Sequence, residues 1–135
     1  MTFEDLESWQ QARQLTRQIY VLTRNHPLVK DFGMCDQMQR AAVSVMSNIA
    51  EGFERLHVPE KLQVYNVARG SSAEVRSLLY VVEDNYPGAA SEAVRLRDHV
   101  AGVGKLLTGL IQSTESRRSK LTRLLTSIVH LLSPV

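Results

Sequence analysis

The chain has 135 residues, of which 44% are hydrophobic and 22% charged, with 7 glycines and 4 prolines. This length and composition suit one globular domain and exclude a disordered chain. The net charge of +2 does not indicate a basic body. Residues 1–116 hold 12 Lys and Arg against 14 Asp and Glu, whereas residues 117–135 hold four cations and no acid.

The low aromatic content and the abundance of Leu, Ala, Gln, Arg and Glu favour helices, because these side chains lose little rotamer freedom there. No apolar run approaches the roughly 20 residues of a membrane span, and the N-terminus does not resemble a signal peptide. We therefore expect a cytoplasmic protein. The single cysteine, Cys35, can form neither an intramolecular disulfide nor half a zinc site.

Apolar residues three and four apart predict two helices in the first half of the chain. The first is expected at about residues 3–24, and Asn25, His26 and Pro27 end it. The second is expected at about residues 35–55, where Asp36 can accept hydrogen bonds from free backbone amides.

Two further helices follow. The third begins at Pro59, which suits a first helical turn because its missing N–H would be unpaired there, and ends at the turn formed by residues 85–88. The fourth starts near Ser91 and ends in the polar run 112–119. Four such helices with short loops predict an all-α, up-down-up-down four-helix bundle in residues 1–116.

Residues 117–135 form a basic, amphipathic C-terminal extension. Its apolar residues lie on one side of a helix, so the segment either continues the fourth helix or forms a separate terminal helix. These residues are Leu121, Leu124, Leu125, Ile128, Val129 and Leu132.

A ribbon of polar residues interrupts the second helix beside its apolar stripe. The members of this polar ribbon, three and four residues apart, are Arg40, Ser44, Ser47, Asn48, Glu51 and Arg55. The third helix carries a second polar set, formed by Arg69, Gly70, Ser71, Ser72, Glu74 and Arg76. We expect the two sets to face each other.

The glycines of these two sets predict a close contact between the helices. Gly costs roughly 1 kcal/mol relative to Ala inside a helix, so we expect Gly52 and Gly70 to allow close backbone approach. The approach would let Arg40 or Arg55 pair with Glu74, let Arg76 pair with Glu51, and let Asn48 bond a serine hydroxyl. Such buried charges would fix the helix register rather than add stability.

Three segments carry a family resemblance: FEDLESWQQA at the start, QMQRAAVSVMSNIAEGFER in the second helix and ARGSSAEVRSLL in the third. They resemble the bacterial four-helix bundle family also called 23S rRNA intervening-sequence proteins, which is similar to the accessory protein of diversity-generating retroelements. The resemblance covers about residues 3–112. The matching residues are Arg40, Ala41, Ser44, Asn48, Ile49, Ala50, Glu51, Gly52, Gly70, Ser71 and Glu74.

The resemblance implies a ring-like homo-oligomer of five bundles, with no enzymatic activity and no cofactor. Two features depart from the family pattern. Members often carry Pro where this chain has Met46, and the tail after about Thr114 has no counterpart in the family.

Two clusters of cations are candidates for contact with nucleic-acid phosphates. Arg13, Arg17 and Arg24 share one face of the first helix, where the alternative is a solvated surface. Arg117, Arg118, Lys120 and Arg123 have no acid among them, and they allow three readings: contact with RNA or DNA, contact with an anionic membrane surface, or solvation while the apolar side docks on a neighbouring bundle.

No motif predicts catalysis or a metal site. The four histidines lie far apart without metal-ligand spacing, and no nucleophile, base and oxyanion donors converge, so no small-molecule substrate is expected. The sequence favours a non-enzymatic homo-oligomer that binds nucleic acid or a nucleic-acid-processing partner. The alternative is an oligomeric protein-interaction scaffold without nucleic-acid binding.

Overall fold

A computed structural model describes residues 1–133, in which four α-helices and three short 3₁₀ turns occur and no strand is present. The helices are α1 (Glu7–Leu22), α2 (Phe32–Glu54), α3 (Val58–Asn85) and α4 (Ala90–Leu132). The 3₁₀ turns are η1 (Phe3–Asp5), η2 (Leu28–Lys30) and η3 (Pro87–Ala89). Residues 134 and 135 of the predicted extension lie outside the described residues.

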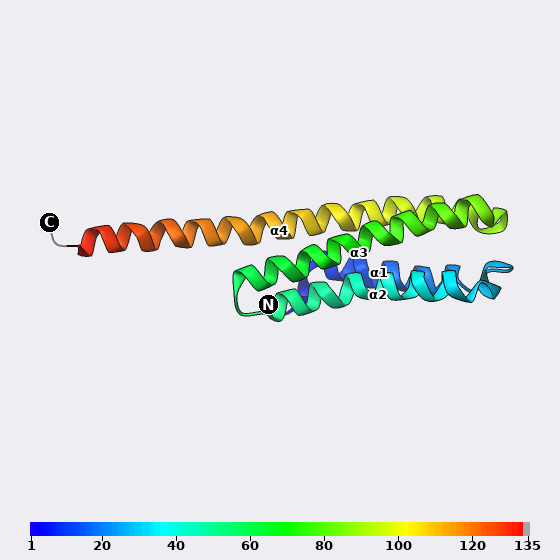
Figure 1. The fold of residues 1–135 in the computed structure, drawn as a ribbon, viewed down its shortest axis with the longest axis horizontal. Helices are drawn as coiled ribbons and strands as arrows, with labels where there is room; N and C mark the ends of the chain where they lie inside the picture. Colours follow the sequence, from blue (N-terminus) through cyan, green and yellow to red (C-terminus); the bar gives the residue numbers. More distant parts are fainter. Residues whose placement is uncertain (134–135) are drawn as a thin grey trace.

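The helices run alternately up and down, as Figure 1 shows. α3 packs against both α2 and α4, and α1 packs against α2 and α4, so the bundle closes on itself. The all-α class is therefore confirmed. No helix within residues 1–133 combines the length and the apolar character needed to cross a membrane.

The core consists of the apolar side chains that the helical spacing predicts. They interdigitate along the bundle axis, and burying each fully is worth about 1.5–3 kcal/mol. The largest fully buried side chains are Tyr65, Leu15, Ile19, Leu28, Met38, Ile49, Leu79, Leu96, Leu107, Val45, Val75 and Val82.

The structure corrects the start of the first two helices. α1 begins at Glu7 rather than at residue 3, because Leu6 is extended (φ −71°, ψ 126°) and separates η1 from the helix. α2 begins at Phe32, three residues before the predicted start, and its N-cap is Asp31 rather than Asp36. The Asp31 carboxylate accepts from the backbone N–H of Met34 at 3.2 Å.

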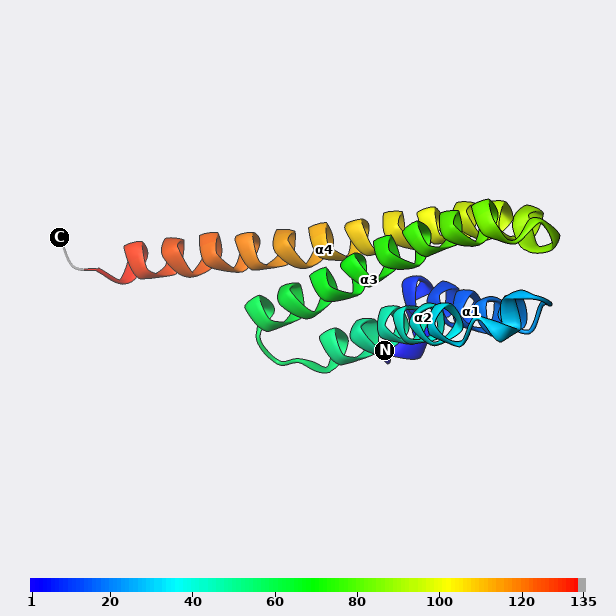
Figure 2. The same cartoon turned by 45° about the vertical axis from the view of Figure 1, so that its right-hand side comes forward.

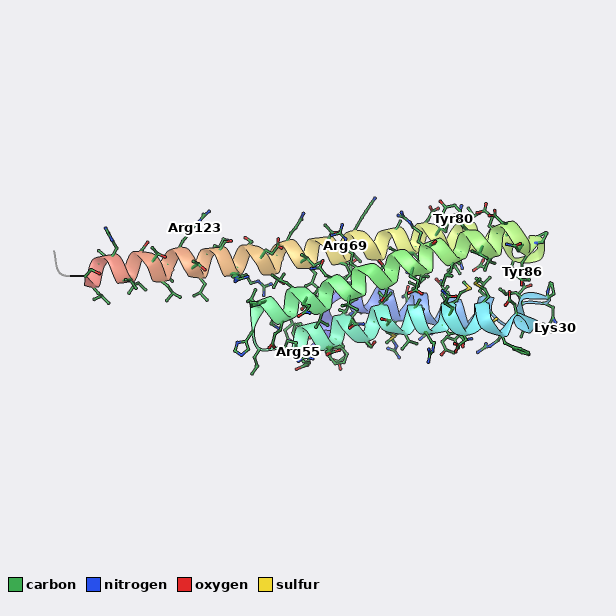
Figure 3. All side chains as sticks on the ribbon, viewed as in Figure 1. Lys30, Arg55, Arg69, Tyr80, Tyr86 and Arg123 are labelled. Carbon is green, nitrogen blue, oxygen red and sulfur yellow. The ribbon has the colours of Figure 1, made fainter. Side chains whose placement is uncertain are left out.

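Asp31 also ties the start of α2 to the turn between α3 and α4. The Tyr86 hydroxyl donates to its second carboxylate oxygen at 2.5 Å. This bond, and next the bond from Met34, lower the pKa of Asp31. One carboxylate thereby holds two loops together at the same end of the bundle (Figure 3).

The segment after the predicted end of the fourth helix continues that helix. α4 runs without a break to Leu132, so of the two alternatives the continuation is correct. Thr114 is its last buried residue, and residues 115–133 are all exposed. Leu62 of α3 still lines a hollow with the first of these residues, and Figures 1 and 2 both show the rest of this part of α4 projecting alone past the end of the bundle.

Candidate nucleic-acid interface

The polar ribbon of α2 meets α3 through small hydroxyl groups. The Ser44 and Ser71 hydroxyls lie 2.8 Å apart across the two helices. The Asn48 amide donates to the Ser44 hydroxyl at 3.0 Å and to the Ser44 carbonyl at 2.8 Å. Asn48 does bond a serine hydroxyl, but this serine lies one turn away on α2 rather than across the helix contact, and the chain Asn48–Ser44–Ser71 links α2 to α3.

The predicted ion pairs between α2 and α3 are wrong. Arg40 pairs with Asp36 at 3.6 Å and Arg55 with Glu51 at 2.5 Å, each one turn away on the same helix. In both pairs at least 47% of each side chain is exposed, so the charges are solvated rather than buried. The serines make the helix contact, which leaves the longer charged side chains at its rim, as Figure 3 shows for Arg55.

The two motif glycines differ in their surroundings. A Cβ added to Gly52 would lie 2.6 Å from two ring carbons of Tyr65 on α3, so the close approach predicted at Gly52 is present. A Cβ on Gly70 would meet nothing within 4 Å in the chain, and Gly70 is exposed. The expectation that Gly70 draws α2 and α3 together is therefore wrong within one protomer.

Next to Gly52, a lysine of α3 satisfies the end of α2. The Lys61 ammonium donates to the carbonyl of Phe53 at 2.5 Å and to that of Gly52 at 3.3 Å, and lies 5.5 Å from the Phe53 ring centre. Burial is the main cause that lowers the pKa of Lys61, and nearby Arg117 lowers it further. Lys61 therefore caps the last carbonyls of α2, where the helix dipole favours a cation.

The ion pair that does cross between helices joins α3 to α4. Arg97 pairs with Glu83, and their side chains are only 17% and 31% exposed. The Arg97 guanidinium also lies 4.0 Å from the centre of the Tyr80 ring. The sequence does not reveal this pair, because the two residues lie on different helices whose relative rotation only the fold sets.

A histidine of α4, close in sequence to Arg97, bridges α4 to α1. The His99 ring nitrogens lie 2.7 Å from the side-chain oxygen of Gln18 and 3.1 Å from that of Gln11. Burial, followed by the nearby Arg95 charge, lowers the pKa of His99. An imidazole held between two side-chain amides is a packing element, and residues 1–133 hold no group of three His, Cys, Asp or Glu side chains able to bind a metal ion.

The cations predicted to contact phosphates lie on two separate surfaces. Arg13 and Arg17 are exposed on α1, where the Arg13 guanidinium lies 5.7 Å from the Trp9 ring centre, and Arg24 is exposed in the turn after α1. The remaining four are exposed along the projecting part of α4, and none of the seven forms a salt bridge within the described part of the chain. The extension cations are Arg117, Arg118, Lys120 and Arg123.

A third cationic surface, not predicted, is a groove of about 510 Å³ between α3 and α4. Arg69 and Arg76 line it from α3 and Lys105 from α4, and none of the three has a salt-bridge partner in residues 1–133. Small residues, including Gly104 and Gly109, also line it. We call this feature the α3–α4 groove.

The α3–α4 groove contains no acid, unlike the hollows that flank the polar ribbon. Asp36 lines two hollows beside Arg40, and Glu74 also lines one of these. A further hollow at the start of the extension combines Arg118 and Arg123 with Glu115. The spacing of Arg69 and Arg76, two turns apart, was visible in the sequence, but which neighbouring helix they face was not.

Comparison with curated proteins finds no similar sequence. The sequence profile of the 23S rRNA-intervening sequence protein family, in contrast, matches residues 4–109. The match includes the ribbon of α2, the serines and glycine of α3 and the lining of the α3–α4 groove except Gln112, and it ends before the extension begins. The chain therefore belongs to the 23S rRNA-intervening sequence protein family.

Proposed function

We propose that this protein is a non-enzymatic homo-oligomer, built from five copies, that binds the phosphate backbone of a nucleic acid along the α3–α4 groove. The pentamer is supported by the family resemblance of the ribbon motif. The cationic lining of the α3–α4 groove supports a phosphate-bearing ligand. The exposed cations of the extension continue the positive surface along α4.

The observation that carries this proposal is the unbalanced charge of the α3–α4 groove. Arg69, Arg76 and Lys105 converge there with no carboxylate in the lining, and no acid within the described chain pairs with them. A phosphodiester backbone supplies the missing negative charge, and its binding releases condensed counterions.

The lining of the α3–α4 groove favours contact with the backbone rather than with bases. It offers the hydroxyl of Thr108 and the amide of Gln112, both common phosphate partners. It contains no aromatic side chain on which a base would stack. We therefore expect binding with little sequence preference.

A salt titration of binding tests the groove. Replacing Arg69, Arg76 and Lys105 by Gln should remove about three phosphate contacts per protomer. Each contact contributes a slope of about 0.9 in log affinity against log salt, so a three-contact site loses about 40-fold in affinity between about 50 and about 200 mM salt. The groove variant should bind short duplex DNA or RNA weakly and lose most of this salt dependence.

A matched variant separates the groove from general positive charge. Replacing Arg13, Arg17 and Arg24 by Gln removes the same number of cations from α1 and the turn after it, and should leave most of the binding. Replacing the four extension cations tests that surface separately. Loss of binding in the extension variant with full binding in the groove variant would reject the groove, and no binding to the intact oligomer at low salt would favour the scaffold function.

The assembly has its own test at Gly70. Space is open around Gly70 within the chain, so Gly70→Leu should leave the helix content unchanged. If this motif residue lies in the ring interface, the larger side chain breaks the pentamer, and light scattering reports a lower mass. An unchanged pentamer would remove Gly70 from the interface, and a wild-type mass other than five protomers would reject the pentamer.

A further inference from the structure

The extension of α4 leaves a large apolar surface uncovered. From Leu121 to Leu132, seven Leu, Ile and Val side chains are between 42% and 84% exposed. Monomeric proteins rarely expose contiguous apolar patches of this kind, and a helix normally buries such a face against another element. Figures 1 and 2 show no other helix beside this part of α4.

The apolar face of the extension continues the core-facing side of α4. With 3.6 residues per turn, Leu121, Leu124, Leu125, Ile128 and Leu132 fall within an arc of about 100°. The buried residues Val103 and Leu107 lie in the same arc. Arg123 lies opposite, and Figure 3 shows it pointing away from the side on which α1 and α2 lie. The extension therefore carries a core-like face with no core beneath it.

The apolar residues of the extension are arranged symmetrically about one point. About the midpoint between Thr126 and Ser127, reversal of the chain direction exchanges six of the seven apolar residues with one another; the exception is Leu131, which exchanges with Thr122. The exchanged pairs are Leu121 with Leu132, Leu124 with Val129, and Leu125 with Ile128. Such self-complementarity is what a two-fold symmetric interface between identical helices requires.

The charges of the extension select the antiparallel direction. Residues 116–133 hold four cations, all between Arg117 and Arg123, and no acid. Parallel pairing in register would place the four cations of one copy at the same level as the four cations of the other, which is repulsive. Antiparallel pairing about the same midpoint places the cationic part of one copy at the level of the C-terminal part of the other, which has no Lys or Arg; Lys120, for example, lies at the level of Ser133.

The composition of the face and its position favour a second copy over a lipid surface. The face contains Leu, Ile and Val without Trp or Phe, whereas helices that lie in a membrane interface commonly insert such aromatic residues. The paired segment also begins beyond the bundle end, because Thr114 is the last buried residue of α4. An antiparallel partner helix then ends near the level of Lys120 and avoids the bundle.

We propose that residues 121–132 pair antiparallel with the same segment of a second copy of this chain. The pairing joins two protomers, or two rings of protomers, end to end through their extensions. It lies outside the part of the chain that matches the family, and it is independent of nucleic-acid binding.

Mass measurement on the full-length chain tests the pairing whatever the size of the ring. Leu124→Glu, Leu125→Glu and Ile128→Glu together place carboxylates in the apolar face and should halve the mass seen by light scattering. Ser119→Glu, Thr126→Glu and His130→Glu add the same number of carboxylates to the opposite side of the helix.

The second variant should keep the wild-type mass, and circular dichroism should show both variants helical, because all the substituted side chains are exposed. Equal masses for the wild type and the apolar-face variant would overturn the proposal. An equal loss of mass in both variants would also overturn it, because charge rather than the face would then control assembly.

Cross-linking tests the direction of the pair. In a Cys35→Ala background, chains carrying Leu121→Cys are mixed with tagged chains carrying Leu132→Cys and treated with a short bis-maleimide. Antiparallel pairing links the two kinds of chain to each other and neither kind to itself. Links between identical chains would reject this arrangement. It would also be rejected if no links form and the wild type binds phosphatidylserine vesicles while the apolar-face variant does not.

Discussion

Gly52→Ala is expected to destabilise the protein although alanine is the better helix former. The added Cβ would lie 2.6 Å from the Cδ1 and Cε1 atoms of Tyr65 and 3.3 Å from its Cζ. Real Cβ atoms essentially never approach another heavy atom to within 3.0 Å, so the ring or the helix must shift. Tyr65 is only 2% exposed and has little room to move.

The magnitude follows from two opposing effects. Overpacking a core costs typically about 1–3 kcal/mol, and contact with two ring atoms places this site in the upper part of that range. Replacing Gly by Ala inside a helix returns about 1 kcal/mol. The net loss is therefore about 1–2 kcal/mol, which lowers the midpoint of thermal unfolding by roughly 3–8 °C for a domain of this size.

Gly102→Ala is the matched control for thermal and urea unfolding. Gly102 lies inside α4, and nothing lies within 4 Å of an added Cβ, so alanine should stabilise the protein by about 0.5–1 kcal/mol. Adding Tyr65→Leu to Gly52→Ala should relieve part of the clash and give a favourable coupling energy in a double-mutant cycle. A Gly52→Ala protein as stable as the wild type would refute the close-packing explanation of the motif glycine.

Three further changes are expected to alter stability. Folding lowers the pKa of His99, so its contribution to the free energy of unfolding is complete above the unfolded pKa of 6.5 and falls as the pH drops below that value. His99→Gln should therefore make stability against urea less dependent on pH between about pH 7 and pH 5 than it is in the wild type. Arg97→Gln leaves its part-buried carboxylate partner unpaired and should cost about 1–2 kcal/mol in thermal unfolding, whereas Arg95→Gln, in an exposed pair, should change little. Ser44→Ala removes the hydroxyl that joins α2 to α3 and should cost about 1 kcal/mol by urea titration, with exposed Ser47→Ala as the neutral control. A wild-type pH profile for His99→Gln would contradict the effect assigned to His99. Equal losses of stability in Arg97→Gln and Arg95→Gln, or in Ser44→Ala and Ser47→Ala, would contradict the contact of the first residue in that pair.

The sequence was sufficient for the number of helices and for most of the core. Helical spacing of apolar residues is a local property, so it identified the buried faces of all four helices before any contact was known. Pro59 placed the start of α3 within one residue. The start of α2 was missed, because either Asp31 or Asp36 is a chemically suitable cap and the loop geometry decides between them.

The candidate sites were harder to predict, because they depend on how the helices are rotated against each other. The predicted contact between the polar ribbon and α3 is present at Ser44 and Gly52, where small side chains let the two helices come close. Its arginines were misassigned, since a long side chain reaches an acid one turn away on its own helix as easily as one on a neighbour. The α3–α4 groove was missed for the same reason: Arg69 and Lys105 lie 36 positions apart in the sequence.

The sequence by itself determined an all-helical chain, its apolar faces and its family, because periodicity and a motif are properties of neighbouring residues. The tertiary structure alone decided which cations converge, which glycine touches an aromatic ring, and where the bundle ends along α4. Those features depend on distances between helices, and such distances are fixed only when the whole core packs. The exposed face of the extension follows from the same packing, since α4 is longer than the three helices available to cover it.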